Sequence, residues 1–118
     1  MTTKTERDVV TLALRTIAVG SRGETPDAED YADALDVYTA FHGRLQDMYS
    51  RSVSWAQGEV PVEVWVWVSH LLARELIGVF HVSEDLEARV ERLALKAAMN
   101  FKGYQFTRPR KPVEVPLV

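Results

Sequence analysis

Apolar residues recur every three or four positions along four segments of the chain, and this spacing is typical of amphipathic helices. Local signals mark where three of these helices begin. Thr3 and Glu6 have the spacing of a capping box. Thr25 can cap a helix whose first position is Pro26, and Ser83 can cap the last helix. The predicted helices cover residues 5–18, 25–50, 61–80 and 83–103.

The segment between the second and third predicted helices, residues 51–60, has a different pattern. Val53 and Trp55 alternate with small residues, and Gly58 supplies a turn. This pattern predicts an extended loop or a small β-hairpin. Because an isolated hairpin is marginally stable in water, it needs support from the body or from a neighbouring molecule.

The end of the chain differs from the helical part. Gly103 is expected to stop the fourth helix, and three prolines after it exclude a continuous helix. The pattern therefore predicts an all-α fold, with a four-helix bundle-like body over residues 1–103 that includes the short loop or hairpin. An extended, basic, proline-rich tail follows over residues 104–118.

The third predicted helix is apolar around much of its circumference, which places it in the middle of a bundle or of an assembly. Trp65 and Trp67 lie about 200° apart on it, so one core cannot take both rings face-on. Either one ring lies along the edge of the body, or one packs on another subunit, and the amount of apolar surface favours the second. The residues predicted to contact another subunit or a tail component are Trp55, Trp65, Trp67, Tyr38 and Phe41.

Charge is divided unevenly between body and tail. The net charge is −3, with +3 on residues 102–118 and −6 on residues 1–101. Val113, Val115 and Leu117 alternate with other residues and would lie on one side of an extended strand, which favours docking in a partner's groove or on its sheet edge. A solvated terminus and a nucleic-acid-binding tail are the alternatives. The predicted docking residues are Arg108, Pro109, Arg110, Lys111, Pro112, Val113, Val115 and Leu117.

Composition excludes several kinds of chemistry. The 118 residues include no cysteine, which excludes a disulfide scaffold, thiol catalysis and cysteine-ligated metals. His42, His70 and His81 lack metal-ligand spacing, and no phosphate loop or nucleophile elbow is present. His42 lies on the apolar side of the second predicted helix, where a core or interface histidine is expected. Charges interrupt the most apolar stretch, so no membrane span or signal core is expected. We therefore predict a protein that is not an enzyme and has no cofactor, metal or membrane association.

The order of motifs is more specific than any one of them. A helix ending in LRTIAVG (residues 14–20) precedes GETPDAED (residues 23–30), and a long helix then ends in LQDMY (residues 45–49). This order resembles the head-to-tail adaptor family of tailed bacteriophages, also called connector or head-completion proteins. The alanine-rich helix after VSEDL (residues 82–86) is compatible with it, and the resemblance covers residues 8–101.

The resemblance implies a structural protein that forms a ring, typically of twelve copies, beneath the portal. Such a ring joins the capsid to the tail and helps to retain packaged DNA, which passes through without specific binding. The implied partners are the portal protein, further copies of the chain and a tail or nozzle component. The implied location is the virion, at the capsid vertex, after synthesis in the host cytoplasm. The C-terminal tail is then expected to dock on the portal.

Two alternatives remain open. Acidic residues along the second helix would line the DNA channel in a ring, but a plain solvated helix face is the favoured account of them. They are Asp27, Asp30, Asp33, Asp36 and Asp47. The alternative function is a small helical protein-interaction or regulatory module whose C-terminal strand binds another partner.

Overall fold

The computed structural model of the chain describes residues 3–17, 27–48 and 53–107, and side chains up to residue 102. The expected helix start at Thr25 and Pro26 lies outside the described residues, and so does the docking segment over residues 108–118.

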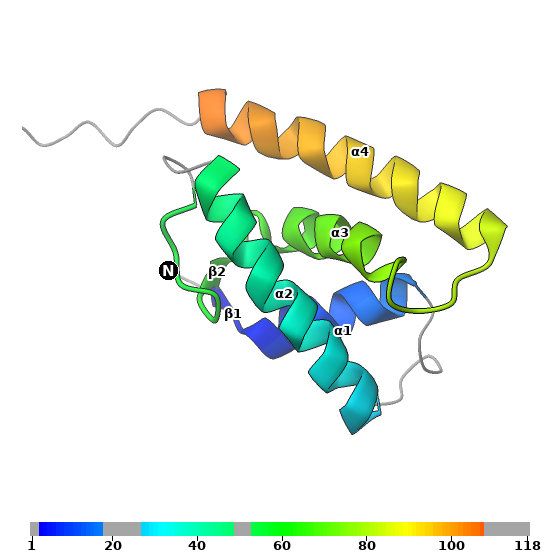
Figure 1. The fold of residues 1–118 in the computed structure, drawn as a ribbon. Helices are drawn as coiled ribbons and strands as arrows, with labels where there is room; N and C mark the ends of the chain where they lie inside the picture. Colours follow the sequence, from blue (N-terminus) through cyan, green and yellow to red (C-terminus); the bar gives the residue numbers. More distant parts are fainter. Residues whose placement is uncertain (1–2, 18–26, 49–52, 108–118) are drawn as a thin grey trace, which may run out of the picture.

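Four helices and one very small sheet make up the described structure (Figure 1). The prediction of an all-α, bundle-like fold is confirmed, and strand structure is limited to two residues on each side of a single antiparallel pair. In chain order the elements are β1 (Thr3–Lys4), α1 (Glu6–Thr16), α2 (Ala28–Met48), β2 (Val60–Pro61), α3 (Trp65–Leu76) and α4 (Glu84–Thr107).

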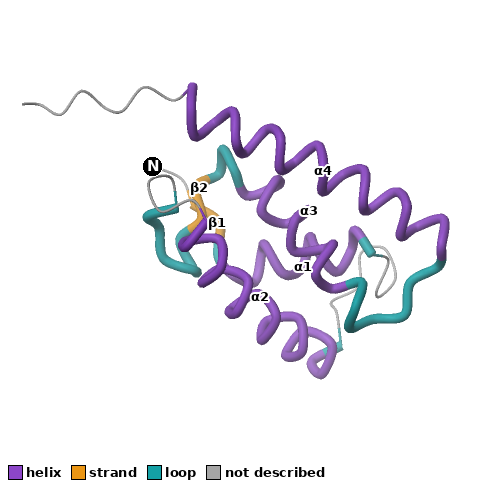
Figure 2. Tube along the Cα trace, turned by 45° about the horizontal axis from the view of Figure 1, so that its top comes forward, coloured by secondary structure: helices purple, strands orange, loops and turns teal. Residues whose placement is uncertain are grey.

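Helix α3 is the centre of the body, because it contacts each of the other three helices. Figures 1 and 2 show α4 along one side of α3, with α1 and α2 on other sides. Apolar side chains from every turn of α3 are buried, and among them Val68, Leu72 and Leu76 are fully inaccessible to solvent. The apolar circumference that suggested another subunit is thus largely covered within one chain.

The start of α1 differs from the prediction. Thr5, not Thr3, is the cap: its hydroxyl accepts a hydrogen bond from the Asp8 amide at 3.2 Å, and the Asp8 carboxylate accepts one from the Thr5 amide at 3.0 Å. Thr3 lies in β1, opposite Pro61. The backbone of Thr3 is committed to the sheet, so the capping box forms two residues later.

Three further helix boundaries can be compared with the prediction. Pro61 was the first residue of the predicted third helix, but it belongs to β2, and α3 begins at Trp65. Ser83 caps α4 as predicted, since its hydroxyl accepts a hydrogen bond from the Leu86 amide at 3.4 Å. Gly103 does not end α4, which continues to Thr107. A glycine inside a helix costs about 1 kcal/mol but does not forbid it, so the first four residues assigned to the tail are helical.

Of the two structures predicted for residues 51–60, the described part forms the loop and not the hairpin. Residues 53–59, called here the Trp55 loop, form no strand, and β2 pairs instead with β1 near the start of the chain. The sequence pattern missed this sheet, because two-residue strands far apart in the chain leave no periodic signal. Through it, the start of the chain is attached to the residues that enter α3.

Candidate interaction surfaces

The aromatic residues predicted to lie at a subunit interface fall into a buried set and a half-buried set. Tyr38 is 0% exposed and Phe41 is 6% exposed, so both belong to the core of the single chain. Trp55, Trp65 and Trp67 are half-buried and pack against that core. The ammonium of Lys4 lies 4.7 Å from the centre of the Trp65 ring, which gives that ring a partner inside the protein. Neither Tyr38 nor Phe41 offers a surface to a second molecule.

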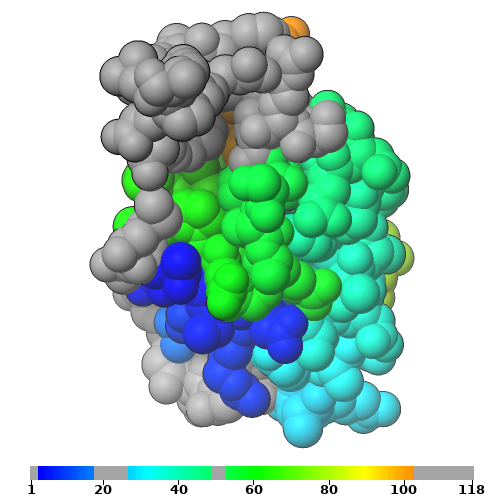
Figure 3. Space-filling view, turned by 90° about the vertical axis from the view of Figure 1, so that its left-hand side faces the viewer, coloured from blue at the N-terminus to red at the C-terminus, as the bar shows by residue number. Residues whose placement is uncertain are grey.

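Hydrogen bonds attach the Trp55 loop to two helices. The Tyr38 hydroxyl donates to the Gln57 carbonyl at 3.0 Å. The Gln57 side-chain amide donates to the Glu6 carboxylate at 3.0 Å and to the Thr39 hydroxyl at 2.9 Å. Figure 3 shows this part of the chain, in green, between the blue start of the chain and the cyan α2. Burial, with a smaller contribution from Glu6, raises the pKa of Tyr38.

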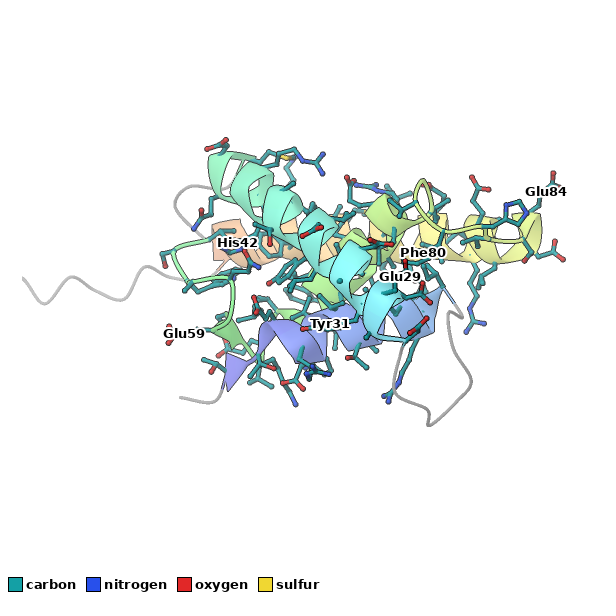
Figure 4. The ribbon with its side chains drawn as sticks, turned by 60° about the horizontal axis from the view of Figure 1, so that its bottom comes forward. Glu29, Tyr31, His42, Glu59, Phe80 and Glu84 are labelled. Carbon is teal, nitrogen blue, oxygen red and sulfur yellow. The ribbon has the colours of Figure 1, made fainter. Side chains whose placement is uncertain are left out.

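The same loop covers an aromatic cluster near the end of α4. The Trp55 ring meets the fully buried Phe101 ring edge-on, with 6.2 Å between centroids. On α2, Tyr38 and His42 make a similar contact at 6.0 Å. Figure 4 places His42 at the end of the molecule where Glu59 lies, away from Glu84 at the start of α4. Phe101 therefore fixes this part of α4 to the body.

His42 was the histidine that the sequence placed on the apolar side of its helix, and it is 6% exposed. Burial lowers its pKa, and the backbone of Trp55 opposes that shift. Within the described residues, the Trp55 backbone lies near the His42 ring, but neither imidazole nitrogen makes a hydrogen bond of good geometry, and the Trp55 indole nitrogen also makes none. The arrangement favours a neutral imidazole packed among aromatic rings.

The other two histidines are separate from this cluster. His70 lies on α3, where burial lowers its pKa, and His81 is exposed in the turn before α4. Over residues 3–17, 27–48 and 53–107, no three metal-ligating side chains come together in a group that could hold a metal ion. The helices of this part of the chain include none with the length and apolar character needed to cross a membrane.

The acidic side chains of α2 stay open to both interpretations. Glu29, Asp33, Asp36 and Asp47 are exposed, and Asp30 is partly buried. Exposure of this kind fits a solvated face, and it equally fits the wall of a channel.

Sequence reasoning missed a pair of large apolar residues that stay exposed on α4. Leu95 is 61% exposed and Met99 is 68% exposed, and both lie on α4. The inward stripe of that helix is formed by Val90, Ala94 and other buried residues, and Leu95 and Met99 lie off it. The signal was present as two large apolar residues four positions apart outside the stripe.

Comparisons with protein-family models, with curated proteins and with solved structures found no match to this chain.

Proposed function

We propose that this chain is a structural head-to-tail adaptor of a tailed bacteriophage, without catalytic activity, and that it joins the portal to the tail. It acts as a ring beneath the portal in the virion, typically of twelve copies, and helps to retain DNA that passes through without specific binding. The motif order described above, from LRTIAVG to the alanine-rich helix, is the basis of the proposal. The helical bundle-like body is compatible with it.

One observation supports the proposed docking role of the tail. Phe101 is fully buried against Trp55, and the loop that carries Trp55 is bonded to α1 and α2. The helix that leads into the basic, proline-rich residues is therefore held to the body close to where those residues begin. A fixed starting point lowers the entropy lost when an extended segment reaches its binding groove.

The experiment is assembly of the purified chain with the portal protein of the same phage, followed by electron microscopy and native mass measurement. We expect rings seated on the portal. Removal of residues 108–118 should leave the helical circular dichroism unchanged and abolish attachment. A chain that ignores the portal would instead favour a small interaction module with a different partner.

A matched pair of substitutions tests the tail more finely. In an extended strand, Leu117 shares one side with Val113 and Val115, while Val118 points to the other side. Leu117→Asp should abolish attachment to the portal, and Val118→Asp adds the same charge but should leave attachment intact. Equal effects of the two substitutions would contradict a docking strand of this register.

A further inference from the structure

His42 is buried where α2 meets the Trp55 loop. Its side chain is 6% exposed, the Tyr38 ring meets it edge-on, and the backbone of Trp55 lies near it. Figure 4 shows His42 and Glu59, the last residue of the loop, at the same end of the molecule. Within the described residues, neither imidazole nitrogen makes a hydrogen bond of good geometry. A positive charge on this ring would therefore be buried without a partner, which is costly.

The Trp55 loop is the weakly held side of this contact. Of residues 53–59, only Val53 is buried, and Trp55 is half-buried. The loop is attached through the hydrogen bonds of Gln57, one of them to the Glu6 carboxylate, and through the contact of the Trp55 ring with Phe101. Segments with few buried residues open at a lower free energy than a packed core. Release of the loop therefore costs less than unfolding of the helices beneath it.

Charged neighbours do not compensate a positive charge on His42. Burial lowers its pKa, and among the described residues the opposing contribution comes from the Trp55 backbone. Tyr38 stays neutral, because burial raises its pKa. Arg44 of α2 is paired with Glu75 of α3. Further charged residues at this end of the body are exposed, and they are Asp47 near the end of α2, Glu59 and Glu63 on either side of β2, and Lys102 near the end of α4.

We propose that protonation of His42 releases the Trp55 loop from α2, while the four helices stay packed. In the closed protein the ring is dry and neutral. In the open protein water reaches the ring, which then takes up a proton near the ordinary histidine pKa of about 6.5. Because the open form binds the proton more strongly than the closed form, a fall in pH favours opening. Opening exposes Trp55 and uncovers Phe101, the residue that holds this part of α4 to the body.

The size of the effect has an upper limit. Between about pH 7.5 and about pH 5.5, the open fraction should rise by at most about tenfold, a limit set by the ordinary histidine pKa. Histidine is the only side chain whose ordinary pKa lies in this range, so other groups contribute little. The device needs no portal. It therefore goes beyond the proposed adaptor function, and either one can fail without the other.

Thiol labelling of the full-length chain measures the opening, and the absence of cysteine makes single-cysteine variants unambiguous. Val53→Cys places a thiol in the loop at a position that is 3% exposed, and Ser69→Cys places one on α3 at a position that is 0% exposed. Each variant is labelled with dithiodipyridine at both pH values. Each rate is divided by that of the same variant unfolded in urea at the same pH, because the thiolate is the reacting form.

The normalised rate at Val53→Cys should rise by up to about tenfold toward acid. Ser69→Cys reports unfolding of the body, so its normalised rate should be far lower than that of Val53→Cys at both pH values. Circular dichroism should show the same helical content at the two pH values.

Substitutions of histidine identify the group that takes up the proton. His42→Gln keeps a polar side chain and His42→Phe keeps an aromatic ring, and neither can be protonated. In the Val53→Cys background, both should abolish the rise of the labelling rate toward acid. His70→Gln is the matched control, because burial also lowers the pKa of His70, which lies on α3 away from the loop. It should leave the rise unchanged.

Three outcomes would overturn the proposal. The first is a normalised rate at Val53→Cys that is the same at both pH values. The second is a rise that persists in both His42 variants or that disappears in His70→Gln. The third is an equal normalised rate at Val53→Cys and Ser69→Cys at acid pH, which means that the whole body opens and not the loop alone.

Discussion

Substitution of Tyr38 by Phe removes one hydroxyl group from the centre of the contact between the Trp55 loop and α2. The ring stays, so packing is preserved, but the Gln57 carbonyl loses the donor that lies 3.0 Å away. Loss of a neutral hydrogen bond that leaves a partly buried acceptor unsatisfied costs about 1–2 kcal/mol. We therefore expect the free energy of unfolding at neutral pH to fall by that amount.

The raised pKa of Tyr38 adds a second, opposite effect at high pH. Its pKa in the unfolded chain is near 10.0, and burial raises it in the folded protein. Above pH 10 the unfolded chain loses this proton while the folded protein retains it, so the stability contributed by Tyr38 is lost as pH rises. The wild-type protein should lose up to about 1.4 kcal/mol per pH unit relative to Tyr38→Phe. The two stabilities should therefore meet about one unit above pH 10.

Urea unfolding, followed by circular dichroism at several pH values between 7 and 11, measures both effects. Thr39→Val is a useful comparison, since it removes a hydroxyl that accepts from Gln57 but has no titration in this range. A stability difference between wild type and Tyr38→Phe that stays constant with pH would refute the titration argument. A difference near zero at pH 7 would refute the hydrogen-bond argument.

Other predictions concern the cap of α1, the buried histidine and the end of α4. Thr5→Ala should lower the free energy of unfolding by about 1 kcal/mol in urea titrations, whereas Thr3→Ala should cost much less if the capping box begins at Thr5. Because burial lowers the pKa of His42 from 6.5, the unfolded chain takes up a proton first, so stability should fall with pH below 6.5. His42→Gln should flatten that acid slope in thermal unfolding, and an unchanged slope would contradict the assignment. Phe101→Ala should cost about 3–5 kcal/mol, with Asn100→Ala as the exposed neighbour that should be nearly neutral.

The burial of two predicted interface residues means that self-association of the chain has to involve other surfaces. Tyr38 and Phe41 are core residues, and α3 finds its partners within the chain. Two of the large apolar residues that stay exposed, Leu95 and Met99, lie on α4, whose most extensive contact is with α3. A ring of copies would use surfaces that stay accessible in one chain, such as Leu95 and Met99 or the half-buried tryptophans. The buried face of α2 is not available for it.

Local chemistry was enough to predict the four helices and one of their caps. The three-to-four residue spacing of apolar positions specifies a helix because one face must be buried, and Ser83 caps α4 through neighbouring backbone amides. His42 was correctly placed on an apolar side because the same spacing includes it. These features depend on residues a few positions apart, and the sequence contains all of that information.

Tertiary structure decided the rest. Thr3 and Pro61 pair with each other in the β1–β2 sheet. Their backbones therefore do not belong to helices, and α1 begins at Glu6 and α3 at Trp65. Whether an apolar residue is core or interface depends on which helices surround it, and periodicity along one helix does not contain that information. Packing around α3 buried Phe41 and left Leu95 in water, although both belong to strongly helical segments. The sequence by itself determined the helices, and only their packing determined which apolar surfaces remain for a partner.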